Sequence, residues 1–121
     1  MFTRIYSTVI PVADQEAALE FWVGKLGFEK RLDVPMGPMR FLTVAPVGAR
    51  TELVLGSSDM FGNGKGFVNG ISFIVDDVDA TYEELIAKGV EVISPPEDML
   101  WGARATSFKD PDGNQHFMTT D

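Results

Sequence analysis

The sequence contains no cysteine, a single histidine and fewer basic than acidic side chains. Without cysteine, the protein has no disulfides, thiolate nucleophiles, iron–sulfur clusters or cysteine-bound zinc. Ten Lys and Arg residues stand against 18 Asp and Glu residues, which gives a formal net charge of −8. Because such a chain repels phosphate backbones, we expect no nucleic-acid partner. The same charge would favour a cationic small molecule, although it also serves general solubility.

Long apolar runs are also missing. No stretch approaches the roughly 20 apolar residues that span a bilayer, and the start MFTRIYSTVIPVAD lacks a charged-then-apolar leader. We therefore expect a cytoplasmic protein with no membrane partner. The chain of 121 residues, 45% of them apolar, is long enough for one globular domain or for two half-size modules that share a core.

The first part of the chain, residues 1–56, predicts the element order β-α-β-β-β. Residues 3–12 form an apolar, β-branched run typical of a strand, and Asp14 follows as a candidate helix N-cap. Apolar residues then recur at helical spacing over residues 15–26, and Gly27 supplies a left-handed stop. Three more strand-like runs follow, separated by turns containing proline or glycine, at 28–34, 39–45 and 51–55.

The pattern then repeats. Residues 57–66 are rich in glycine and predict a linker, in which Phe61 is a candidate lid or dimer contact. Residues 67–121 predict a second module, whose helix is capped by Asp77 or Asp79 and is closed by a glycine. Its expected strands lie at 67–75, 90–94, 103–108 and 114–120.

This internal repeat predicts an α+β fold of two tandem βαβββ modules in one domain. Each helix can cover only one face of its own sheet, so the remaining faces are expected to curve toward a shared concave cleft. We expect function in that cleft.

Five segments carry a resemblance to a known family. The sequence is similar to the vicinal oxygen chelate proteins, which include glyoxalase I, the bleomycin resistance proteins and extradiol dioxygenases. These segments, in chain order, are IPVAD at 10–14, ALEFW at 18–22, KLGF at 25–28, VDDVD at 75–79 and FKDPDGN at 108–114. The resemblance implies paired βαβββ modules in an incomplete barrel, a ligand cleft and a homodimer.

The resemblance also allows a metal site to be tested by position, because metal-dependent members supply one ligand from each of four strands. The four positions are occupied by Ser7, Glu52, Gly70 and Phe117. Only the glutamate keeps a good metal-binding group. His116 adjoins one position, but side chains alternate along a strand, so it faces the other way and is expected to be structural. We predict no tightly bound metal and no cofactor.

Alternation along the same strands predicts a mostly apolar cleft with a few polar groups, as is typical of small-molecule sites. The face could equally be packed core or a dimer interface. Its expected residues are Ile5, Ser7, Val9, Glu52, Val54, Gly70, Ser72, Ile74, Gln115, Phe117 and Thr119.

Glu52 has two open interpretations. Burial in an apolar cleft would make it a candidate catalytic proton acceptor. Alternatively, it forms a salt bridge with Arg40, Arg50 or Arg104, which we favour slightly.

The sequence leaves two hypotheses for the function. The first is a glyoxalase-like or bleomycin-resistance-like protein that sequesters a small aromatic or cationic molecule without metal. A lyase, isomerase or dioxygenase that uses Glu52 or a non-standard metal site is the alternative.

Two tryptophans have different expected roles. Trp101 follows a proline-rich loop, where it could stack on a planar or cationic group of the ligand. Trp22 lies among apolar residues of the first helix and is expected in the core. The predicted ligand-binding residues are therefore Ser7, Val9, Glu52, Gly70, Ser72, Trp101 and Phe117.

Overall fold

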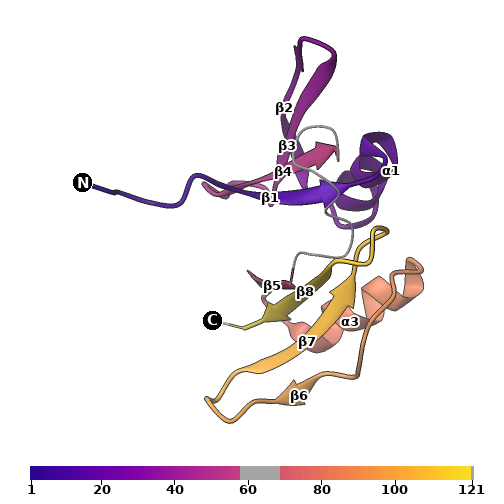
Figure 1. Cartoon of the computed structure of the whole chain (residues 1–121). Coiled ribbons are helices and arrows are strands. Elements are labelled where there is room, and N and C mark those ends of the chain that lie inside the picture. The colour runs from indigo at the N-terminus through magenta and orange to yellow at the C-terminus, as the bar shows by residue number, and fades with distance from the viewer. Residues whose placement is uncertain (58–68, 121) are drawn as a thin grey trace. The chain divides into compact units, whose positions relative to one another are not determined.

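The computed structural model describes residues 1–57 and 69–120. The chain divides into two compact units, residues 1–65 and 66–121. Each unit contains one four-stranded sheet and one helical segment, which confirms the predicted pair of βαβββ modules (Figure 1). Phe61 and residues 58–66 of the expected linker lie outside the described residues.

Unit 1 is a sheet of strand order β1-β4-β3-β2. β1 runs parallel to β4, and the β2–β3 and β3–β4 pairs are antiparallel. The β2–β3 hairpin projects past the rest of the sheet in Figure 1. The elements of unit 1 are β1 (Ser7–Val12), α1 (Gln15–Leu19), the π-helix η1 (Glu20–Lys25), β2 (Glu29–Met36), β3 (Met39–Ala45) and β4 (Glu52–Ser57).

The helical segment of unit 1 begins and ends as its sequence predicts. Asp14 is the N-cap, and its side chain accepts hydrogen bonds from the backbone N–H groups of Glu16 and Ala17. Gly27 ends the segment with a φ of 77°, in the left-handed region where glycine carries no steric penalty. The wider turns of η1 were not predicted from the helical spacing.

Unit 2 has the equivalent sheet, of strand order β5-β8-β7-β6. Of the two candidate caps, Asp77 caps the helix, since its side chain accepts a hydrogen bond from Ala80 N. Gly89 follows the helix with a φ of 78°. The elements are β5 (Asn69–Ile74), α3 (Val78–Ala87), β6 (Glu97–Asp98), β7 (Arg104–Lys109) and β8 (Gln115–Thr119).

Two predicted strands differ from the structure. The strand predicted over residues 3–12 begins only at Ser7, where the register of β4 provides its first paired residue. The strand predicted over 90–94 is reduced to a single bridge at Val92, and pairing resumes only in the short β6. Pro95 and Pro96 separate the two, and because proline has no N–H, the ladder cannot continue through them.

An arginine in each unit identifies the sheet face that the helix covers. In unit 1, Arg40 of β3 bonds to Glu16 of α1. In unit 2, Arg104 of β7 bonds to Asp79 of α3, with a distance of 2.6 Å from Nε to Oδ2. The side chains that alternate with these arginines along each strand therefore lie on the sheet face away from the helix.

The core of unit 1 lies between its helix and its sheet. Trp22 is fully buried there, as predicted, and packs against Phe21 and Phe28 with ring centroids 5.3 and 5.2 Å apart. Ile10 and Leu55, paired on neighbouring strands, are also fully buried. These contacts fix the sheet under the helix and leave its other face to carry the candidate site.

Candidate functional site

The candidate site is the face of the unit 1 sheet that points away from α1. Strand register places its residues in neighbouring rows: Ser7 pairs with Glu52, Val9 pairs with Val54, and Thr43 pairs with both Val54 and Leu32. We call this the helix-free face of unit 1. Its residues are Ser7, Val9, Glu29, Leu32, Val34, Met36, Met39, Phe41, Thr43, Glu52 and Val54.

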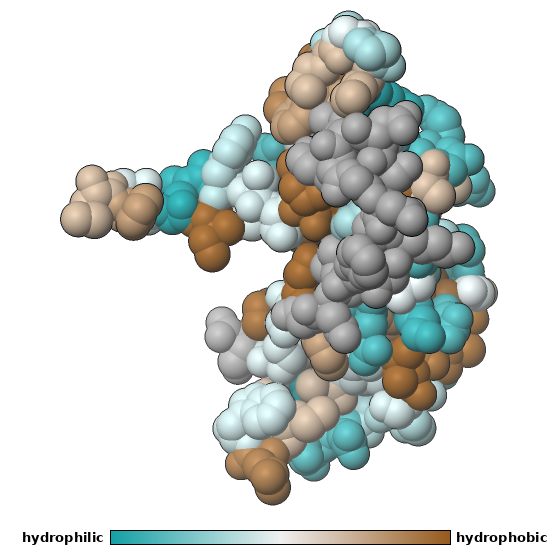
Figure 2. Space-filling model, viewed as in Figure 1, coloured by the Kyte–Doolittle hydropathy of each residue, from teal (hydrophilic) through white to brown (hydrophobic). Residues whose placement is uncertain are grey.

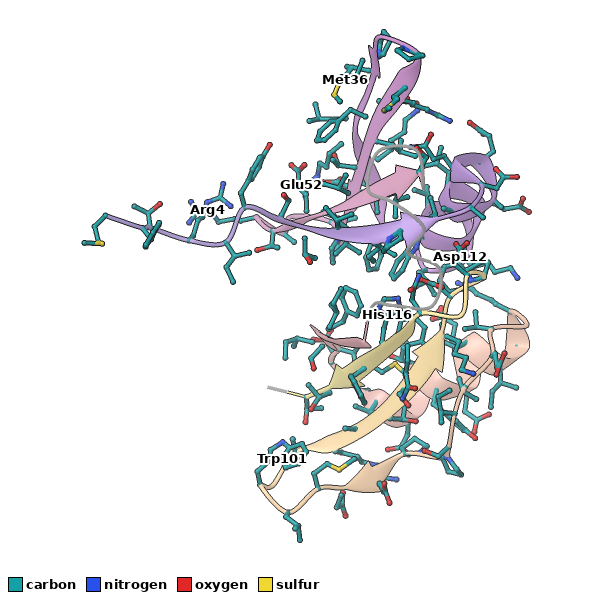
Figure 3. All side chains as sticks on the ribbon, viewed as in Figure 1. Arg4, Met36, Glu52, Trp101, Asp112 and His116 are labelled. Carbon is teal, nitrogen blue, oxygen red and sulfur yellow. The ribbon has the colours of Figure 1, made fainter. Side chains whose placement is uncertain are left out.

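Exposure varies across the helix-free face. Thr43 and Val54, in its centre, are buried, whereas Leu32, Val34 and Met36 on β2 are 38 to 48% exposed. In Figure 3, Met36 lies near the tip of the β2–β3 hairpin and Glu52 lies toward its base. The paired residues Ser7 and Glu52 form a polar row on the same face. This polar row and the exposed apolar side chains of β2 together suit an amphipathic small molecule.

Glu52 is the main charged group in that polar row. Its side chain is 12% exposed, and Oε2 lies 3.7 Å from Nη1 of Arg31. Oε1 is buried and has no hydrogen-bond partner among the described residues. A buried acceptor without a donor is costly, so this oxygen stands to gain a hydrogen bond from a ligand.

The salt bridge of Glu52 corrects our prediction of its partner. Arg31 takes that role, rather than Arg40, Arg50 or Arg104. Arg40 is engaged by Asp33 and Glu16, and Arg104 by acidic residues of unit 2.

Arg31 is the residue that sequence reasoning missed. A register shift in β2 falls between Lys30 and Leu32, so Arg31 has no paired residue on β3. Its guanidinium also binds Glu29 at 2.6 Å and the backbone oxygen of Ala49 at 2.8 Å. Simple alternation could not have placed a side chain located at a bulge.

The predicted site residues of the second module lie in unit 2. Ser72 of β5 pairs with Phe117 of β8, so these two lie side by side on the face away from α3. Gly70 falls where the register of β5 shifts. Trp101, which is 75% exposed, lies in the turn between β6 and β7, closed by a hydrogen bond from Gly102 N to Met99 O. Unit 1 thus brings together Ser7, Val9 and Glu52, and unit 2 brings together Ser72 and Phe117.

His116 has the structural role expected from its strand parity. It is fully buried, and its Nε2 lies 3.0 Å from Oδ2 of Asp110. Its ring packs against Phe108 and Phe73, with centroids 5.5 and 6.0 Å apart. The imidazole therefore belongs to the core between the sheet and α3.

The residues at the four metal positions of the metal-dependent relatives do not fit a metal ion. Glycine and phenylalanine offer no ligand atom, and a serine hydroxyl is a poor ligand for most divalent ions. The one carboxylate, Glu52, already faces the positive charge of Arg31. Within residues 1–57 and 69–120, no group of three or more His, Asp or Glu side chains is placed to hold a metal.

Comparisons with known proteins agree with this fold. The family model of the glyoxalase/bleomycin resistance protein/dioxygenase superfamily matches residues 4–116. The chain therefore belongs to this superfamily, as its five sequence segments indicated.

Individual relatives cover nearly the whole chain. A superfamily member from Sphaerobacter thermophilus, known from a crystal structure, has 45% sequence identity to this chain. The two structures match with a TM-score of 0.91, over 99% of this chain and 98% of that one. TnmS3, an antibiotic binding protein from Streptomyces sp. CB03234, is 36% identical, with a TM-score of 0.89 over 98% and 96% of the two chains. The uncharacterized protein YetH of Bacillus subtilis is 39% identical over 94% of this chain and 95% of its own.

Among the described residues, no helix is long and apolar enough to cross a membrane.

Proposed function

We propose that this protein binds a small aromatic or cationic molecule without a metal ion and protects the cell by sequestering it. The observation that carries the proposal is the composition of the helix-free face of unit 1, where the largely buried carboxylate of Glu52 adjoins the apolar side chains of Val9 and Val54. Apolar surface supplies affinity and a few polar groups fix orientation in sites of this kind. The 36% identical TnmS3, which is an antibiotic binding protein, supports a small-molecule ligand.

Within this proposal, the ligand-binding residues of unit 1 are Ser7, Val9 and Glu52, and those of unit 2 are Gly70, Ser72, Trp101 and Phe117. Trp101 is suited to stacking on a planar group, because it is an exposed tryptophan on a tight turn. The named residues then act as a binding surface, with no covalent chemistry required of any of them.

Titration with bleomycin and with planar aromatic cations such as ethidium tests the proposal. We expect saturable quenching of tryptophan fluorescence in the wild type, together with a heat of binding by calorimetry. The Trp101→Phe variant should lose most of the quenching, because the remaining Trp22 is fully buried. If no compound of the panel produces heat or quenching, the proposal is wrong.

A catalytic role for Glu52 is the second candidate function, and the buried Oε1 without a donor favours it, since such an oxygen can accept a proton. In that case the protein is a lyase or isomerase of the same superfamily. Turnover that Glu52→Gln abolishes and Glu52→Asp retains would support this candidate. Stoichiometric recovery of unchanged ligand after binding supports sequestration instead.

We also propose that the protein is a homodimer. Residues 1–6 precede β1 as an extended segment whose apolar side chains are exposed, including Phe2 at 98% and Ile5 at 72% (Figure 2). Such side chains are suited to burial against a second copy. Light scattering should give twice the 13.3 kDa mass of one chain, and a mass of one chain at micromolar concentration contradicts the proposal.

A further inference from the structure

The two oxygens of the Glu52 carboxylate have different surroundings. Oε2 faces Nη1 of Arg31 at 3.7 Å, whereas Oε1 is buried without a hydrogen-bond partner among the described residues. A carboxylate oxygen forms its strongest hydrogen bonds with charged donors. Oε1 is therefore the atom of this face that gains most from a donor brought by a ligand.

Other contacts hold Arg31 on the Oε2 side. Its Nε donates to Glu29 at 2.6 Å, and its Nη2 donates to the backbone oxygens of Ala49 at 2.8 Å and Pro46 at 3.3 Å. These three hydrogen bonds hold the guanidinium beside Glu52. Within unit 1, Arg31 is thus committed to one side of the carboxylate.

The charges around this group favour a cation over a neutral donor. Glu29 and Glu52 flank the single positive charge of Arg31, so the three side chains carry a net charge of −1. Access to Oε1 needs only local motion, because the Glu52 side chain retains 12% exposure and the last torsion of a glutamate is soft.

Apolar side chains continue from this polar row along the helix-free face. Val9 and Val54 adjoin Ser7 and Glu52 in the strand register, and the exposed Val34 lies further along on β2. We infer that the ligand of this face is an ammonium compound with a flat apolar body, whose N–H group donates to Oε1 of Glu52 while the body lies on the apolar strands. This inference rests on the proposed binding function and specifies its ligand class.

Three naphthalene probes that differ only in the substituent test this inference. They are 1-naphthylmethylamine, charged at neutral pH, 1-naphthalenemethanol, a neutral donor, and 1-methylnaphthalene, which has no donor. Affinities are measured by following amide shifts in ¹H–¹⁵N NMR spectra. We expect the amine to bind the wild type about tenfold or more tightly than the methyl compound, with the alcohol between them, because a hydrogen bond between charged groups is stronger than a neutral one.

Two variants test whether the Glu52 carboxylate causes the tighter binding of the amine. Glu52→Gln keeps the size of the side chain and removes its charge, so it should weaken amine binding about tenfold and change methylnaphthalene binding less than twofold. Glu91→Gln, which makes the same change at an exposed site in unit 2, should leave all three affinities unchanged.

The outcomes separate this inference from the proposed function. If the methyl compound binds as tightly as the amine, or if Glu52→Gln leaves amine binding unchanged, the inference is wrong while small-molecule binding stands. If neither the naphthalene probes nor bleomycin and the planar aromatic cations bind, the proposed function itself is wrong.

Discussion

At the scale of single residues, Asp110 is the most heavily engaged side chain of unit 2. It is 1% exposed, and it accepts hydrogen bonds from the backbone N–H groups of Asp112 and Asn114 and from the Asn114 amide. Nε2 of His116 lies 3.0 Å from the same carboxyl group. The turn between β7 and β8 is thus organised around one buried carboxyl group.

The Asp110→Asn variant should therefore be strongly destabilised. Its amide NH₂ would face existing donors and leave some of them buried without acceptors, which lowers the free energy of unfolding by about 3 kcal/mol. Urea denaturation followed by circular dichroism measures this change. Asp76→Asn, the same substitution at an exposed position, should stay within about 0.5 kcal/mol of the wild type. Equal effects of the two substitutions would contradict this account of the turn.

At the scale of elements, two glycines of the first helical segment have opposite requirements. Gly27 has a φ of 77°, where a side chain is strained, whereas Gly24 lies within η1 and has no such φ. A Cβ at Gly24 would meet the Cγ of Glu20 at 3.7 Å, which is an ordinary contact.

We expect Gly27→Ala to lower the free energy of unfolding by about 1 kcal/mol and Gly24→Ala to raise it by about 0.5 kcal/mol. Thermal denaturation of the two variants beside the wild type measures both changes. A stabilising Gly27→Ala would show that residue 27 does not hold the left-handed conformation.

The two units repeat one ion-pair arrangement. In unit 1, Arg40 binds Asp33 of the neighbouring strand as well as Glu16 in the first helical turn. In unit 2, Arg104 binds Asp98 of the neighbouring strand as well as Asp79 in the first helical turn. This arrangement connects the start of each helix to its sheet. Because both units contain it, the internal repeat includes these ion pairs as well as the order of helices and strands.

These pairs give the stability of the protein a pH dependence. The hydrogen bond from Arg40 holds the pKa of Asp33 well below its ordinary value, and the hydrogen bond from Arg104 lowers the pKa of Asp79. A carboxylate with a lowered folded-state pKa stabilises the fold above its ordinary pKa of about 3.9, and this contribution is lost as the pH falls further.

Between pH 5 and pH 3, the unfolding free energy should therefore decline less steeply in Asp33→Asn than in the wild type. Urea titrations at a series of pH values measure both slopes. The difference should shrink in 1 M NaCl, because salt screens exposed ion pairs. Parallel slopes at low salt would contradict the assigned role of Arg40.

At the scale of the whole molecule, we predict that the chain binds no metal ion although it belongs to this superfamily. The resemblance assigns Ser7, Gly70 and Phe117 to three of the ligand positions, which leaves Glu52 as the one good ligand of the set. We expect purified protein to carry less than 0.1 equivalent of Fe, Mn, Ni or Zn by elemental analysis after dialysis against a chelator, a threshold of roughly one site in ten. One equivalent retained through dialysis would contradict both this prediction and metal-free binding.

Local sequence predicted most of the fold. Asp14 and Asp77 cap their helices, and Gly27 and Gly89 end them, because these effects depend on residues close together in the chain. The boundaries of β1 and the short β6 could not be predicted, since a strand extends only as far as a partner strand pairs with it.

The sequence by itself determined the two βαβββ modules and their superfamily, because both follow from residue type and order. Only the tertiary structure decided that Arg31 approaches Glu52 and that one carboxylate oxygen is left without a donor. The physical reason is the shift in β2 register at Arg31, a property of the pairing between strands that no local pattern records.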